Sequence, residues 1–281
     1  SDVPLYDRML GAGGAANMAK WLAPGTRYWD EIVAHPHYDD YWKARAVPLH
    51  ARRIRADVLV VGGTFDAEDL YGPIATYRSL RAANPRGDVS LVMGPWSHGG
   101  WMGRGDRLGA WDGFGDTGEE FRDRVVLPWF VSRLKGKRPV RVPRESWYVT
   151  GENRWVRGET PKAAATRSAL AADGTLSSDL AISGSASYRV DPADPVPFLG
   201  EKTASVPSSF MGAREDDRDR PRPDDRPLWR SAPKEKTETW LGPVRWNLDV
   251  ATSGTDGDVV VKILDEDEKG VRRLVRWDVM R

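Results

Sequence analysis

Residues 57–100 decide the fold of this chain: they begin with DVLVVGGTFDAEDL (57–70) and end with DVSLVMGPWSHGG (88–100). Each quoted segment opens with an apolar, β-branched run that breaks at glycine, which is typical of a buried parallel strand. Between the runs, apolar side chains recur at helical spacing from Leu70 to Leu80. The order strand, helix, strand predicts a βαβ unit of a parallel sheet.

An acid and a histidine each follow one of these predicted strands. Asp66 comes just after the first run and His98 just after the second. The carboxyl ends of parallel strands meet at one edge of a sheet, so we expect the two side chains to be neighbours. In an α/β-hydrolase the acid precedes the histidine along the chain, which would make His98 a general base oriented by Asp66. The alternative is a histidine that only caps its own loop.

The nucleophile of such a triad is missing from the chain. No Gly-x-Ser-x-Gly occurs, and the nearest candidates, Ser97, Ser185 and Ser187, lack a strand–elbow–helix setting. The chain also starts at Ser1 without methionine. We therefore expect a fragment of a longer protein that is inactive by itself.

Composition excludes several classes of function. The chain has 281 residues with 42 basic and 41 acidic side chains, a balance that argues against a nucleic-acid partner. No apolar run approaches the ~18 residues of a membrane span. There is no cysteine, so disulfides and thiolate metal sites are excluded. His35-Pro36-His37 is too weak a pattern to predict a metal site, and we expect neither a metal nor a cofactor.

The texture of the sequence changes near Pro139. Before it, a helix is predicted from Glu119 to Leu134, kinked by Pro128. After it, short β-type runs separated by Gly, Pro, Asp and Ser predict an antiparallel sandwich or jelly roll. These runs are Ser146–Thr150, Arg167–Leu170, Ala186–Val190, Thr237–Leu241, Arg245–Val250, Val259–Leu264 and Arg272–Trp277. The acidic run Asp265–Gly270 fits a hairpin turn better than a calcium loop.

The segments 63–72 (GTFDAEDLYG) and 94–98 (GPWSH) resemble the acid and histidine motifs of the cocaine esterase/X-Pro dipeptidyl-peptidase (S15) hydrolases, and most closely those of α-amino-acid ester hydrolases and glutaryl acylases. Residues 35–42 resemble the family's linker from a helical cap. Residues 147–155 and 191–197 resemble landmarks of its C-terminal jelly roll.

The resemblance implies a fold of the class α/β plus all-β. Residues 1–50 would be the end of the helical cap and a linker. Residues 51–138 would be the C-terminal part of an α/β-hydrolase sheet. Residues 139–281 would be a truncated jelly roll.

The resemblance also implies roles for residues of the acid motif. Asp66 would be the triad acid, His98 the base, and Glu68 and Asp69 the carboxylates that bind a substrate's α-ammonium group. The alternative for Glu68 and Asp69 is that acids at a helix start favour the helix dipole whatever the substrate. The family's serine elbow and oxyanion-hole tyrosine lie upstream and are absent here.

The expected function is that of a serine-type acyl hydrolase, in the full-length protein, acting on a small-molecule amino-acyl or peptidyl ester or amide. An X-Pro dipeptidyl-peptidase or a general carboxylesterase of the same family is the alternative. A reading from another class is a non-catalytic jelly roll that binds carbohydrate through Trp229, Trp240 and Trp246. No nucleic-acid or membrane partner is expected, a homo-oligomer is compatible with the sequence, and the resemblance leans towards a periplasmic or secreted protein.

Overall fold

The structure is a computed structural model that describes residues 26–66, 68–108, 111–136, 140, 142–158, 165–182, 184–191, 214–215, 227–255 and 257–280, together with residues 8, 11, 12 and 17. Most of the predicted cap segment before residue 26 lies outside the described residues, as do residues 192–197 of the second jelly-roll landmark.

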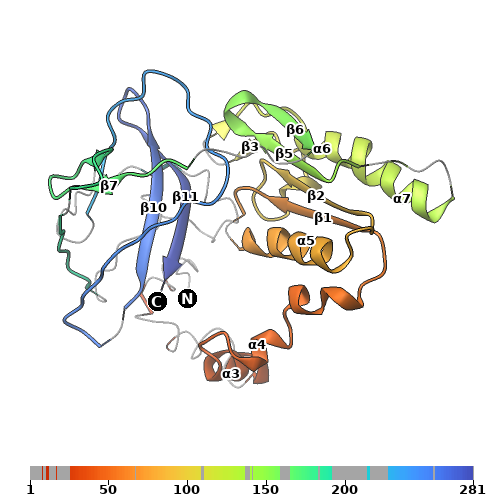
Figure 1. Cartoon of the computed structure of the whole chain (residues 1–281), viewed down its shortest axis with the longest axis horizontal. Helices are drawn as coiled ribbons and strands as arrows, with labels where there is room; N and C mark the ends of the chain where they lie inside the picture. The colour runs from red at the N-terminus through yellow and green to blue at the C-terminus, as the bar shows by residue number, and fades with distance from the viewer. Residues whose placement is uncertain are drawn as a thin grey trace.

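A four-stranded sheet forms the centre of the first half of the chain (Figure 1). Its strands are β1 (Val58–Gly63), β2 (Val89–Gly94), β5 (Glu145–Val149) and β6 (Arg154–Gly158), in the order β1-β2-β5-β6. The first three are parallel, and β6 returns antiparallel to β5. Val58 pairs with Val89 and Gly63 with Gly94, so β1 and β2 end at the same level. The predicted βαβ unit is confirmed.

Helices cover both faces of this sheet. Helix α5 (Tyr71–Ala83) packs on one face, and the helices that follow β2 pack on the other. Because side chains of a strand alternate between faces, each face collects its own cluster. The α5 cluster includes Val60, Leu91, Met93, Tyr77 and Leu80, and the opposite cluster includes Leu59, Val61, Val92, Phe121 and Val125. Every residue of β2 is buried, which explains why its run is apolar except for Ser90.

The predicted helix from Glu119 to Leu134 is present with one irregularity. It consists of α6 (Thr117–Phe121), a π-helical turn (Arg122–Val126) and α7 (Leu127–Leu134). The π turn ends two residues before Pro128, which has no N–H to donate and whose ring would clash with a preceding carbonyl. The helix ends before Gly136, whose φ of 58° is the left-handed conformation common after helix ends.

The α/β sheet continues past the predicted boundary at residue 139. Strands β5 and β6, which the sequence places in the β region, extend this sheet as far as Gly158, with Leu91 of β2 paired to Glu145. A sequence pattern predicts that a strand exists but not which strand it pairs with. The α/β sheet is therefore larger than predicted.

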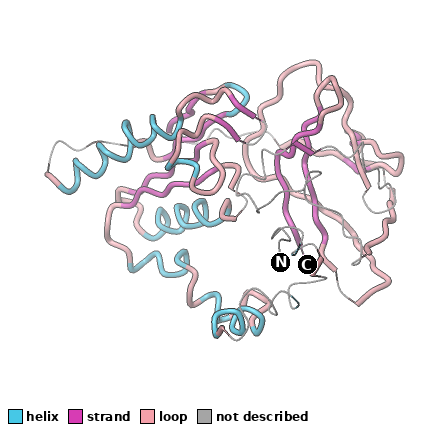
Figure 2. Tube along the Cα trace, turned by 180° about the vertical axis from the view of Figure 1, so that it is seen from behind, coloured by secondary structure: helices cyan, strands magenta, loops and turns pink. Residues whose placement is uncertain are grey.

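The second half of the chain is built on a long hairpin, with extended loops beside it (Figure 2). Strands β10 (Val259–Glu266) and β11 (Arg272–Met280) pair antiparallel, and β9 (Arg214–Glu215) adds to β11. A separate pair joins β7 (Ala169–Leu170) to β8 (Leu176–Ser177). The acidic run is a hairpin turn, as predicted: Gly270 has a φ of 76°, and Asp267 Oδ1 accepts the N–H groups of Lys269 and Val271.

Three predicted strands are absent from the described residues. Residues 186–190, 237–241 and 245–250 are extended or irregular without strand pairing. Extended segments without a partner strand in the described chain cannot form ladder hydrogen bonds. The jelly roll itself stays a prediction.

The remaining elements are short. They are α3 (Arg27–Ala34), α4 (Asp40–Lys43), β3 (Arg107–Leu108), β4 (Trp111–Asp112) and the 3₁₀ helices Val47–Arg53, Gly100–Met102 and Thr150–Glu152. Within the described part of the chain, no helix is both long and apolar enough to cross a membrane.

Candidate active site

The loops that follow β1 and β2 are tied to one another. Thr64 donates both its backbone N–H (2.9 Å) and its hydroxyl (3.0 Å) to the carbonyl of Gly94. The N–H of Phe65 donates to the carbonyl of Trp96 at 3.1 Å. A Cβ at Gly63 would lie 2.0 Å from the same Trp96 oxygen, so only glycine permits this approach. The two loops therefore hold one fixed relative position.

This position brings Asp66 and His98 together, as the sequence predicts. His98 Nδ1 lies 3.0 Å from Asp66 Oδ2 and 3.3 Å from Oδ1. The Asp66 side chain is only 3% exposed. Its Oδ1 also accepts the backbone N–H groups of Glu68 (2.8 Å) and Asp69 (3.0 Å), which fix the carboxylate in its plane. A buried, hydrogen-bonded acid thus orients the imidazole.

The hydrogen bond to Asp66 raises the pKa of His98 above its ordinary value, and the charges of Asp66, Glu68 and Asp69 add to the effect. Since Nδ1 is engaged by Asp66, Nε2 is the nitrogen left for proton transfer. The His98 side chain is 46% exposed, and its Nε2 lies 3.8 Å from Glu68 Oε2. The free nitrogen therefore has a carboxylate beside it, which the sequence did not predict.

Glu68 and Asp69 precede helix α5 rather than standing in its first turn, because the helix begins at Tyr71. Both residues are exposed. Asp69 Oδ1 accepts the N–H of Gly72 at 3.0 Å, as a capping side chain does. Asp69 is thus partly committed to the helix start, whereas Glu68 faces the imidazole.

A buried hydrogen-bond chain holds the loop that carries His98. Trp96 is 1% exposed, and its indole N–H donates to the hydroxyl of Thr117 at 2.9 Å. That hydroxyl donates in turn to the carbonyl of Gly105 at 2.6 Å. These hydrogen bonds join the loop that carries His98 to the start of α6. The sequence did not predict the contact between Trp96 and Thr117. The only signal for it was the tryptophan of the Gly-Pro-Trp segment that precedes His98.

The His35-Pro36-His37 segment is engaged in local packing. His35 Nδ1 lies 2.6 Å from Asp39 Oδ2, and its ring stacks on Tyr41 with the centroids 4.3 Å apart. Among the residues that the structure describes, no three His, Asp or Glu side chains are grouped so that they could hold a metal ion.

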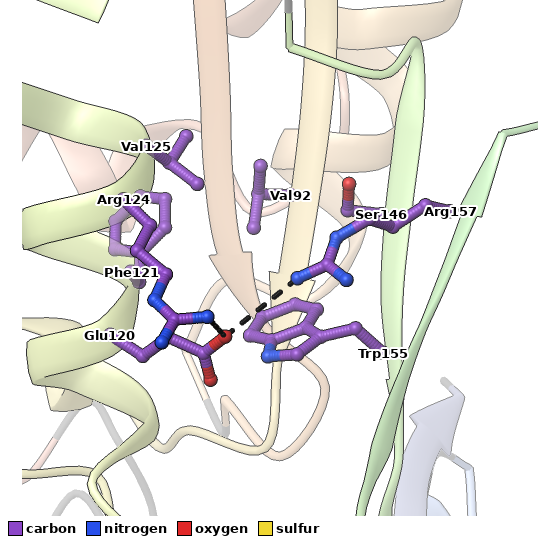
Figure 3. Close-up of a pocket in the computed structure, with 8 residues that line it drawn as sticks. All are labelled: Val92, Glu120, Phe121, Arg124, Val125, Ser146, Trp155 and Arg157. Atoms are coloured by element: carbon purple, nitrogen blue, oxygen red, sulfur yellow. Dashed lines mark ion pairs between the residues drawn. The ribbon is translucent and has the colours of Figure 1, made fainter. Parts of the chain in front are cut away.

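Two cavities lie away from the Asp66–His98 pair. One, of about 20 Å³, lies between the helix of Glu120 and Phe121 and strands β2, β5 and β6 (Figure 3). Glu120 forms ion pairs there with Arg124 (3.6 Å) and Arg157 (3.8 Å). This cavity has room for about one water. The other, of about 230 Å³, is lined mainly by apolar side chains of β5 and β6 and by Leu241. Neither cavity is lined by the pair.

Comparisons with known proteins point to one group of hydrolases. A family model described as X-Pro dipeptidyl-peptidase (S15 family) matches residues 11–100, which include both loops. Cocaine esterase from Rhodococcus sp. (strain MB1 Bresler) is 30% identical over 191 residues, which are 61% of this chain and 32% of the esterase. This chain is similar to the S15 and cocaine esterase hydrolases.

Two solved structures are similar to this chain over nearly its whole length. An aminopeptidase from a marine sediment archaeon, Thaumarchaeota archaeon, matches with a TM-score of 0.82 and 28% identity, over 100% of this chain and 49% of its own. An α-amino-acid ester hydrolase labelled with selenomethionine matches with a TM-score of 0.79 and 27% identity, over 99% and 50%. The chain thus spans about half the length of the solved relatives and a third of the curated one.

Proposed function

We propose that the full-length protein is a serine-type acyl hydrolase that acts on amino-acyl or peptidyl esters or amides. The observation that carries the proposal is the hydrogen bond between the buried Asp66 carboxylate and His98 Nδ1, on the loops that follow two parallel strands. This arrangement leaves Nε2 available on a half-exposed imidazole. Acid, base and strand ends are disposed as in the triad of an α/β-hydrolase.

In this proposal, His98 moves one proton in each half of the reaction. Its Nε2 takes the proton of a serine hydroxyl from a part of the polypeptide outside this chain, while the serine oxygen attacks the acyl carbon. The imidazolium then gives the proton to the leaving alcohol or amine. A water molecule repeats the sequence on the acyl-enzyme and releases the acid. Asp66 stabilises the imidazolium throughout and keeps the proton on Nδ1 in the neutral state.

Glu68 and Asp69 are proposed to bind the α-ammonium group of the substrate. Both side chains are exposed, and their charges act on His98. A cation bound by them would therefore lie beside the reacting atoms. The names of the two structural relatives, an α-amino-acid ester hydrolase and an aminopeptidase, point to substrates with an α-amino group. Because Asp69 Oδ1 already accepts the N–H of Gly72, Glu68 is proposed to contribute more to binding the α-ammonium group.

The second candidate is a general carboxylesterase, which the match to cocaine esterase favours. An X-Pro dipeptidyl-peptidase, after which the matching family model is named, is the third. Of the tryptophans considered for carbohydrate binding, Trp240 is the most exposed, at 65%, while the indole of Trp229 donates to the carbonyl of Ala171. That alternative rests on one exposed ring.

The test is hydrolysis of an amino-acid ester by the full-length protein and two variants. We expect His98→Ala to abolish nearly all turnover and Asp66→Asn to lower kcat by about 10³–10⁴ because it favours the wrong tautomer. His50→Ala is the matched control, since His50 Nε2 lies 3.3 Å from the carbonyl oxygen of Ala44, away from the Asp66–His98 pair. Turnover that survives His98→Ala would overturn the proposal. Residues 1–281 alone should show none.

A further inference from the structure

Arg276 reaches from the C-terminal hairpin into the acid loop. It lies on β11, opposite Ile263 of β10. Its Nη2 donates a hydrogen bond to the backbone carbonyl of Thr64, two residues before Asp66. Its guanidinium carbon lies 5.8 Å from the centre of the Phe65 ring. A single side chain therefore contacts two consecutive residues of the loop that presents the acid.

The guanidinium of Arg276 occupies an unfavourable environment for a charge. Burial lowers the pKa of Arg276, an effect that the charge of Asp278 partly opposes. Its Nη1 is buried without a hydrogen-bond partner among the described residues. Burial of a charge is costly unless partners compensate for it, and the partners here are one carbonyl and one aromatic face. An apolar side chain would suit the strand better unless the contact with the loop has a function.

The contacts of the acid loop explain what Arg276 adds. The N–H and hydroxyl of Thr64 bond to Gly94, and the N–H of Phe65 bonds to Trp96, so these donors are held from the side of β2. The carbonyl of Thr64 is held by Arg276 from the side of the hairpin. With both sides fixed, the peptide plane between Thr64 and Phe65 cannot rotate freely, and the direction in which the chain enters Asp66 is set.

We propose that Arg276 is a positioning residue, which clamps the backbone at Thr64–Phe65 from the C-terminal domain and thereby holds the Asp66 carboxylate against His98. The inference rests on the proposed function in that Asp66 and His98 are taken as acid and base. In this proposal the C-terminal hairpin supports the geometry of the active site, although the hairpin contributes no group to the chemistry.

The pKa of His98 distinguishes positioning from a direct effect of charge. The groups that act on His98 are the carboxylates of Asp66, Glu68 and Asp69. If Arg276 acted only through its positive field, its removal would raise the pKa of His98. If it positions Asp66, its removal loosens the Asp66–His98 hydrogen bond and lowers that pKa. The two mechanisms therefore differ in sign.

The first experiment is an NMR titration of the His98 imidazole in residues 1–281, with its signal among the four histidines identified by His98→Ala. Arg276→Met keeps the apolar stem but removes the donors, and Arg276→Lys keeps the charge and one donor group. The control is Arg273→Met, on the same strand, whose guanidinium pairs with Asp267 at 3.1 Å. We expect a lower His98 pKa in Arg276→Met, a smaller decrease in Arg276→Lys and no change in the control.

A pKa of His98 that is unchanged or raised in Arg276→Met would overturn the proposal. Should Arg276→Met fail to fold, the comparison passes to Arg276→Lys against Arg273→Lys, and equal titration curves for these two would overturn it as well. The titration needs no nucleophile, so its result stands even if the protein proves not to be a hydrolase.

The second experiment measures kcat/KM in the full-length protein. We expect Arg276→Met to lower it about ten- to a hundredfold, mainly through kcat, because a small misplacement of catalytic groups has this effect. Arg276→Lys should recover part of the loss, and Arg273→Met should lose little. If the loss of activity in Arg276→Met only matches the loss of folded protein, and the pKa of His98 is unchanged, Arg276 is purely structural. Activity that survives His98→Ala would refute the proposed hydrolase function. The titration alone would then test whether Arg276 positions Asp66.

Discussion

The carboxylate of Asp66 lies 3.0 Å from His98 Nδ1, yet the acid is 3% exposed and the imidazole 46%. This asymmetry suits a general base, because the buried partner is rigid and the exposed partner can meet a substrate. Asp66 owes its rigidity to the backbone N–H groups of Glu68 and Asp69, which bind its Oδ1. The geometry therefore depends on the loop's backbone and not on the side chains alone.

The first prediction concerns pH. Asp66 raises the pKa of His98 above its ordinary value of about 6.5. A group whose pKa is raised by folding stabilises the protein below its unfolded pKa, and this contribution is lost as pH rises through the folded pKa. The difference in free energy of unfolding between wild type and His98→Ala should thus shrink as the pH rises from about 6.5, until it levels off above the folded pKa. Urea unfolding at several pH values measures it, and a difference that grows with pH would contradict the assigned ion pair.

The second prediction concerns the contact between the two loops. A Cβ at Gly63 would lie 2.0 Å from the Trp96 carbonyl oxygen, which is backbone and cannot rotate away. Gly63→Ala should therefore force the loops apart and destabilise the protein by about 1–3 kcal/mol. It should also lower the pKa of His98, because Asp66 moves with the loop. Gly151→Ala is the control, since a Cβ there meets nothing within 4 Å. Equal stability of both variants would show that the approach is not tight.

The third prediction tests the buried hydrogen-bond chain behind His98. Thr117→Val keeps the shape of the side chain but removes the acceptor for the Trp96 indole and the donor to Gly105. The buried Trp96 indole N–H and the half-buried Gly105 carbonyl then lose their partners, and an unpaired buried polar group costs about 1–3 kcal/mol. We expect a loss of about 2–4 kcal/mol in urea unfolding. Thr239→Val, at an exposed hydroxyl that donates to Glu152, should change stability by less than about 0.5 kcal/mol. A loss no larger than this control's would mean that the network contributes little.

The sequence was sufficient to predict the part of the fold that is local. The unit β1–α5–β2 follows from apolar periodicity over residues 57–94, and the meeting of Asp66 with His98 follows from the rule that parallel strands end at one edge. These inferences need no knowledge of distant contacts. The confirmed hairpin turn at Gly270 is local in the same way.

Contacts between distant residues were not predictable. The sequence predicts β structure in residues 145–158, but their pairing with β2 is decided by packing and was not predicted. Arg276 is one of many arginines, and nothing in the sequence marks it as the residue that reaches Thr64. The start of the helix was not predictable to the residue either: Glu68 and Asp69, considered as acids at a helix start, lie ahead of Tyr71, the first residue of α5.

The last prediction separates an amino-acyl hydrolase from a general esterase. Glu68→Gln in the full-length protein removes a charge next to His98 Nε2 while keeping the shape of the side chain. A charge-assisted contact is worth about 1.5–3 kcal/mol when buried, but Glu68 is 66% exposed, so we expect about 1–2 kcal/mol, or about five- to thirtyfold in kcat/KM. The loss should fall on an amino-acid methyl ester and spare a matched ester without the amine. Asp69→Asn should have a smaller effect on selectivity, because Asp69 also caps α5.

The assay is best read as the ratio of kcat/KM on the two esters at about pH 6.5–7, where an α-amino group with a pKa of about 7.7–8.0 is protonated. Glu68 contributes to the raised pKa of His98, so its removal changes the fraction of active base, but this change affects both substrates equally and cancels in the ratio. Under this condition, a loss confined to the amine-bearing ester identifies Glu68 as a ligand of the α-ammonium group. Equal losses on both esters would instead mean that Glu68 acts on the imidazole or the loop. The protein would then be better described as a general esterase, with Asp66 and His98 in unchanged roles.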